Sequence, residues 1–108
     1  MKKQNTTNSQ SMTAEFKAQV VYGFLERLEV IILGATLKGN IEKGMRAHLR
    51  IGQTGREGNW EIVEIQHMDF INDIDGNDFQ GLVVRCENVA DFNLIKSLRL
   101  YHETILID

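Results

Sequence analysis

The chain has 108 residues, of which 43% are hydrophobic and 25% charged, and it carries a formal net charge of -3. This length and balance are those of a single globular domain, and no apolar run approaches the roughly 18 residues of a membrane-spanning helix. The acidic balance argues mildly against nucleic-acid-binding domains, which usually carry a basic excess. Cys86 is the single cysteine, so an intrachain disulfide is excluded and we expect a cytoplasmic protein with no membrane contact.

Residues 1-12 are polar, rich in Asn, Thr, Ser and Gln, and without hydrophobic periodicity. We expect them to form a disordered tail, followed by one domain over residues 13-108. The lysines at positions 2 and 3 are not followed by an apolar segment, so a secretion signal is not expected.

The first element of the domain is ambiguous between strand and helix. Alternate residues are apolar and predict a strand with one buried face: Phe16, Ala18, Val20, Tyr22 and Phe24. Phe16, Val20 and Phe24 also lie four residues apart, as on one face of a helix. The adjacent valines at 20 and 21 and the glycine at 23 disfavour a helix, so a strand over residues 14-24 is the favoured interpretation.

A second strand is predicted over residues 28-38, and it contains a continuous apolar run of Val30, Ile31, Ile32 and Leu33. Such a run is typical of a strand buried on both faces. In a small barrel only one face points inward. We therefore expect the outward residues to be covered by the tail, by a partner protein, or by a second copy in a homodimer.

The third predicted strand follows a turn with two glycines, Gly39 and Gly44. It covers residues 45-51, where apolar residues alternate with Arg46, His48 and Arg50. After a polar loop over residues 52-59, further strands are predicted at residues 60-70, 81-86 and 98-107. A short helix over residues 92-97, capped by Asp91, precedes the last strand. Six short strands with one helical turn predict an all-β fold, a small closed barrel.

Three motifs occur in an order typical of one protein family. Gly34, Gly39 and Gly44 precede an alternating strand, Ile-Val-Glu-Ile-Gln stands at residues 62-66, and an Asp-Gly-Asn-Asp turn at 75-78 leads to Gly81. Together they span residues 16-107 and resemble the second domain of elongation factor Tu-like translation GTPases. The resemblance implies a Greek-key β-barrel of the translation-protein type, here as a stand-alone domain.

In that family a separate P-loop domain binds the nucleotide, and this chain has no G-x-x-x-x-G-K-[ST] motif. GTP binding is therefore not expected. The family's second domain helps to hold the aminoacylated end of tRNA, and the resemblance places that contact at Gln66, Asp69 and Asn77. Gln66 replaces a glutamate and Asp69 replaces an arginine. A carboxylate repels phosphate, so the resemblance supports the fold more than the tRNA contact.

A basic surface is a second candidate site. Arg46, His48 and Arg50 share one face of the predicted third strand, and Lys38, Lys43 and Arg85 could extend that face. Such a surface could contact phosphate or an acidic partner. A solvated strand face with no binding role is the alternative.

No catalytic, metal or cofactor site is predicted. The acidic loop at residues 73-78 lacks the first and last ligands of a calcium loop. His48, His67, His102 and Cys86 do not stand at zinc-ligand spacing. Cys86 shares its parity with Leu82 and Val84 and is expected in the core. The sequence thus predicts a non-catalytic binding module that contacts RNA, a ribonucleoprotein or a protein. The alternative is a structural or protein-interaction domain, as a homodimer through residues 30-33 or a subunit of a larger assembly.

Overall fold

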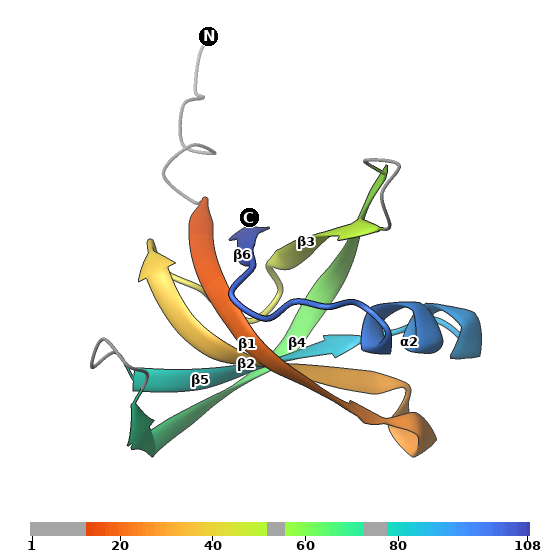
Figure 1. Ribbon diagram of the computed structural model, residues 1–108, viewed down its shortest axis with the longest axis horizontal. Coiled ribbons are helices and arrows are strands. Elements are labelled where there is room, and N and C mark those ends of the chain that lie inside the picture. Colours follow the sequence, from red (N-terminus) through yellow and green to blue (C-terminus); the bar gives the residue numbers. More distant parts are fainter. Residues whose placement is uncertain (1–12, 52–55, 73–77) are drawn as a thin grey trace, which may run out of the picture.

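The computed structural model describes residues 13-51, 56-72 and 78-108, so the tail predicted over residues 1-12 lies outside the described residues. Six antiparallel strands form a closed barrel in the order β1-β2-β5-β4-β3-β6 (Figure 1). The elements are β1 (Ala14–Phe24), a 3-10 turn η1 (Leu25–Arg27), β2 (Glu29–Lys38), β3 (Arg46–Ile51), β4 (Arg56–Asn72), β5 (Asp78–Arg85), α2 (Val89–Lys96) and β6 (Thr104–Ile107). The predicted all-β class and closed six-stranded barrel are confirmed, and the Greek-key classification stays a prediction.

The barrel interior is filled from the alternating residues of each strand. Val30 and Ile32 of β2 stand opposite Val84 and Leu82 of β5, and all four side chains are fully buried. The intervening Ile31 points to the outer surface and stands opposite Val83. The continuous apolar run in β2 is therefore divided between the core and the outside of the barrel, as a one-sided sheet requires.

The prediction that one parity of β1 is buried along its whole length is wrong beyond Ala18. Ala18 stands opposite Gly34, and Val20 stands opposite the next residue, Leu33, so Gln19 is an extra residue in the ladder. An extra residue moves every later side chain to the opposite face. Val21 then packs against the core, and the outward residues become partly exposed: Val20, Tyr22 and Phe24.

Helix α2 lies at the end of the barrel where β1 ends and β2 begins (Figure 1). Its Phe92 and Ile95 side chains are buried. Its N-cap is Asn88, whose Oδ1 accepts from the Asp91 backbone N–H at 2.9 Å. The predicted cap at Asp91 is wrong because the helix begins one turn earlier, and the Asp91 carboxylate instead accepts from Trp60 Nε1 at 3.4 Å. In the described part of the chain, no helix has the length and apolar character needed to cross a membrane.

The last strand is shorter than the predicted span of residues 98-107. β6 begins at Thr104, because His102 adopts a positive φ of 64° that turns the chain. The turn is held to β1 by two backbone hydrogen bonds, from His102 N–H to the Ala18 carbonyl at 2.8 Å and from Ala18 N–H to the Glu103 carbonyl at 2.9 Å. Residues 97-103 are consequently a connection between α2 and β6 that runs along the barrel wall.

Candidate functional site

The three predicted basic residues of β3 do lie together on one face of that strand. Arg46 donates through Nε to the Asn59 side-chain oxygen and through a terminal nitrogen to the Asn59 carbonyl at 3.3 Å. His48 Nε2 lies 2.7 Å from a carboxylate oxygen of Asp108. Arg50 is exposed further along the same face. Two of the three side chains are therefore already engaged within the barrel surface.

Acidic residues on β4 also face this strand. Arg46 stands directly opposite Glu61, and Arg50 stands opposite Glu57. Opposite charges on directly opposed residues reduce the electrostatic potential that either charge would produce away from the protein surface. The β3 face is consequently a mixed-charge surface, which attracts phosphate only weakly.

The residues placed by the family resemblance are not gathered with the basic ones. Gln66 lies on β4, where it stands opposite Gly81 and donates to a carboxylate oxygen of Glu64 at 3.5 Å. Asp69 belongs to the same strand. Asn77 lies outside the described residues. Gln66 lines a groove on the outer wall, whereas His48 and Arg50 line a different one.

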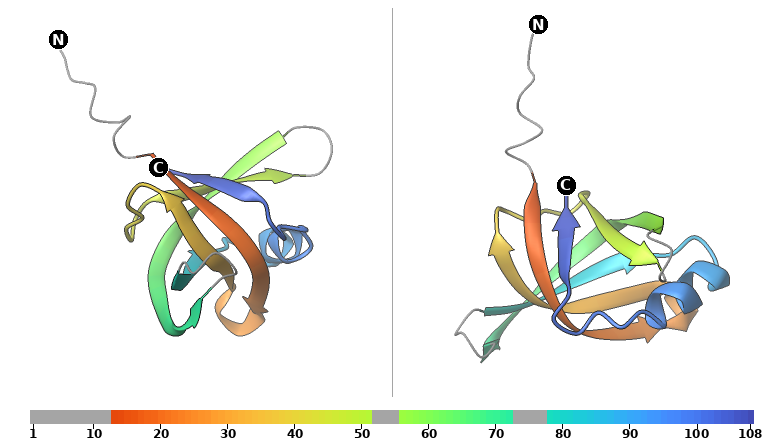
Figure 2. Two further views of the ribbon diagram at one scale, coloured as in Figure 1. Left: turned by 60° about the vertical axis from the view of Figure 1, so that its left-hand side comes forward. Right: turned by 45° about the horizontal axis from the view of Figure 1, so that its top comes forward.

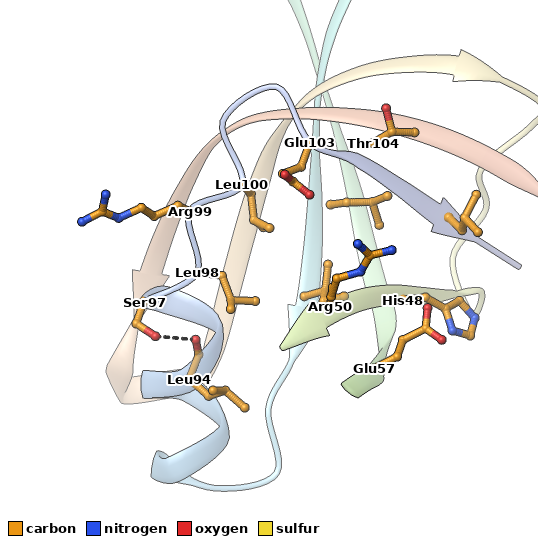
Figure 3. A pocket seen from close by; sticks show the side chains of 13 residues that line it. His48, Arg50, Glu57, Leu94, Ser97, Leu98, Arg99, Leu100, Glu103 and Thr104 are labelled. Atoms are coloured by element: carbon orange, nitrogen blue, oxygen red, sulfur yellow. Dashed lines mark hydrogen bonds between the residues drawn. The ribbon is translucent and has the colours of Figure 1, made fainter. Parts of the chain in front are cut away.

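The larger groove lies between β3, β6 and the connection that follows α2, with a volume of about 680 Å³ (Figure 3). Its lining combines apolar and charged side chains: Leu94, Leu98, Leu100, Leu106, Arg50, Glu57, Arg99 and Glu103. In Figure 3, Leu98 and Leu100 reach from the connection towards Arg50 on β3. Sequence reasoning missed these leucines because residues 98-103 were expected to continue a strand. The only available signal was two leucines flanking Arg99.

The second surface lies on the outer wall of β1, β2 and β5, and we call it the outer apolar face: Val20, Tyr22, Phe24, Ile31, Leu33 and Val83. Tyr22 is 53% exposed, and Val20 and Phe24 are each 39% exposed. Ile31, opposite Tyr22, is nearly covered by its neighbours at 6%. Val83, beside Ile31, is 5% exposed, so the exposed apolar side chains of this face are those of β1.

Charged residues border the outer apolar face. The Arg27 guanidinium lies 4.8 Å from the centre of the Phe24 ring, and its Nε lies 3.2 Å from Glu29. Arg85 contacts the other Glu29 oxygen at 3.7 Å. Glu64 stands opposite Val83 at the far edge. A groove of about 380 Å³ lies here, and its lining includes Arg27, Glu29 and Glu64 but not Arg85.

Cys86 is buried at 3% exposure and belongs to the core cluster, as its parity predicted. Burial raises the pKa of its thiol above the ordinary value of 9.0, and the negative charge of Asp91 raises it further. Within the described residues, no group of three or more histidine, cysteine or acidic side chains is placed to hold a metal ion. The buried thiol is therefore a packing group rather than an exposed nucleophile.

The buried thiol leads to an expected pH dependence. The Cys86 pKa is higher in the folded state than the value of 9.0 expected in the unfolded state. Well below pH 9.0 the thiol is protonated in both states and does not affect the pH dependence of stability. Above pH 9.0 the unfolded state loses this proton more readily, so stability falls. The stability of Cys86→Ala should fall less between about pH 8 and pH 10. Urea unfolding of both proteins across this range measures the difference. Parallel pH profiles would contradict it.

The comparisons with known proteins identify no relative. No family model, curated protein or solved structure matches this chain. The likeness to the second domain of translation GTPases consequently rests on the three sequence motifs. The candidate sites rest on the geometry of the large groove and of the outer apolar face.

Proposed function

We propose that this protein is a non-catalytic binding module whose partner is a polypeptide, and that the outer apolar face mediates its association with a second copy of the chain. The observation that carries the proposal is the exposure of Tyr22 and Phe24 beside Ile31 on the outer wall. Contiguous exposed apolar patches are typical of protein interaction sites. Aromatic residues are also enriched at the centres of interfaces.

The charges around the face support a second copy as the partner. A two-fold dimer brings the same patch of both chains together, so the patch has to be complementary to itself. Arg27 and Arg85 border one end of the outer apolar face, and Glu64 borders its β4 edge. A two-fold arrangement can place the arginine end of one copy opposite Glu64 of the other, with the tyrosines and phenylalanines between them.

An RNA partner takes second place in this proposal. Its support is the resemblance to translation GTPases, in which the barrel would act in the cytoplasm as a stand-alone domain that binds no GTP. The mixed charge of the β3 face weakens this version, since affinity for nucleic acid depends on cations that can neutralise phosphates. A polypeptide contact needs no such excess.

Replacing Tyr22 by lysine is expected to abolish self-association, because it sets a charge at the centre of the outer apolar face. Sedimentation velocity over a range of concentrations measures the effect. The wild type should shift from monomer to dimer as concentration rises, and Tyr22→Lys should remain monomeric. At concentrations at which both are monomers, the two proteins should have the same unfolding temperature.

Tyr101→Lys is the matched control, since Tyr101 is 69% exposed and lies outside the outer apolar face. It should dimerise like the wild type. A wild-type chain that stays monomeric at high concentration would defeat the dimer proposal, as would equal loss of dimer in both variants.

A further inference from the structure

We propose that the large groove between β3 and β6 binds an extended polypeptide segment of a partner protein, which adds to the sheet as a strand at Arg50 and Thr104. This site is distinct from the outer apolar face. In the strand order, β3 and β6 stand on the opposite side of the barrel from β2 and β5. The proposal therefore stands or falls independently of self-association.

The backbone ladder between β3 and β6 is interrupted. Arg46 and Asp108 exchange two backbone hydrogen bonds, of 2.8 and 3.1 Å, and His48 stands opposite Leu106. The pairing between β3 and β6 ends there. Figure 3 shows the two strands close together near His48 and diverging towards Arg50.

The backbone orientation of the next residues follows from the alternation within a strand. In an antiparallel ladder every second residue directs its N–H and C=O towards the same neighbour. Arg46 directs both groups towards β6, so His48 and Arg50 do the same. By the same rule Thr104 of β6 directs its groups towards β3. Among the described residues, Arg50 is not paired with β6 and Thr104 is not paired with β3. Each side of the groove is therefore an open strand edge.

Apolar side chains form part of the lining of the groove. Leu94 of α2, Leu98 and Leu100 of the connection, and Leu106 of β6 all border the groove. Leu106 is 49% exposed although it stands beside the interrupted ladder. A strand added at an open edge places alternate side chains on one side. Side chains of the added strand that point inward would meet Leu98, which packs against the core, and those that point outward would meet Leu106. Their burial would add to the backbone hydrogen bonds.

The charge of the groove favours a peptide over a nucleic acid as its ligand. Arg50 and Arg99 are matched by Glu57 and Glu103 along the lining. Figure 3 shows Arg50 and Glu103 on opposite sides of the groove and Arg99 directed away from it. Because Arg99 points away, the charged side chains left in the groove are Arg50, Glu57 and Glu103, a set that does not attract a polyanion. It suits a segment whose polar groups are mainly those of its backbone. The volume of about 680 Å³ also falls within the range of roughly 300–1,000 Å³ that is usual for binding sites.

The test uses the full-length protein and short random peptides displayed on phage. Peptides enriched on the wild type are synthesised, and their binding is measured by calorimetry. We expect sequences with apolar residues at alternate positions. Binding should fall at least about tenfold for Leu106→Lys and for Leu94→Lys, since each change replaces an apolar contact with a charge. Leu37→Lys is the control. Leu37 is similarly exposed at 47% and lies outside the groove, so binding should not change.

A second measurement reports on strand addition itself. N-methylation of single peptide bonds removes a backbone donor and leaves the side chains intact, so methylation at alternate positions should weaken binding about tenfold. Exchange of the Arg50 and Thr104 amide hydrogens, followed by NMR, should slow when the peptide binds.

Three outcomes would overturn the proposal. One is that no peptide is enriched on the wild type over Leu106→Lys. Another is binding that N-methylation at every position leaves unchanged, with no protection of Arg50 and Thr104. The third is loss of self-association in Leu106→Lys, because the groove would then hold a second copy of the chain.

Discussion

Alanine in place of Gly34 is expected to lower the free energy of unfolding by about 3 kcal/mol or more. A Cβ at this position would lie 2.0 Å from the Lys17 carbonyl oxygen and 2.9 Å from Phe16 Cε2. The first contact is with backbone, so it can be relieved only by separating β1 from β2, and overpacking of this kind costs about 1–3 kcal/mol or more. Thermal unfolding followed by circular dichroism should show a loss of roughly 4–8 °C per kcal/mol.

Gly44→Ala is the matched control, because it tests backbone conformation without a steric clash. Gly44 has a φ of +99° and no atom within 4 Å of an added Cβ. Its replacement should cost about 1–2 kcal/mol through the unfavourable φ alone. A smaller effect for Gly34→Ala than for Gly44→Ala would show that β1 and β2 are not packed as closely as described.

Phe16→Ala is expected to cost about 3–5 kcal/mol, whereas Phe24→Ala on the same strand should cost about 1 kcal/mol or less. Phe16 is fully buried, and its removal leaves a cavity in the barrel core. Phe24 is 39% exposed and contacts Arg27 on the surface. Urea unfolding at concentrations low enough for a monomer measures both values without a contribution from dimerisation.

This pair of phenylalanines is a direct test of the bulge at Gln19. Without the bulge both rings would share one face of β1 and both replacements would be severe. Equal losses of stability for Phe16→Ala and Phe24→Ala would therefore contradict the register shift. A large difference would support it, and with it the outer apolar face.

Much of the fold could be predicted from local patterns. The alternation of Ala47 and Leu49 with charged residues predicted β3, and the parity of Leu82 and Val84 predicted the inward face of β5. These predictions hold because a strand with one buried face repeats every two residues, whichever strand lies beside it. The predicted boundaries were less accurate. β4 begins at Arg56, within residues expected to be a loop.

The candidate sites could be predicted only in part. The shared face of Arg46, His48 and Arg50 was visible in the sequence, but the placement of Glu57 and Asp108 beside it was not, because strand pairing brings these residues there. Leu98 and Leu100 were assigned to a strand, and the structure places them in a connection that borders the large groove.

Hydrophobic alternation and glycine turns are local properties of the chain, and they were sufficient to predict a small closed barrel (Figure 2). The tertiary structure alone decided which side chains face outward beyond Gln19, because a bulge exists only relative to a partner strand. It also decided where β3 and β6 part, and so where the groove opens. Both surfaces proposed for binding depend on strand register, which is set by contacts between residues far apart in the chain.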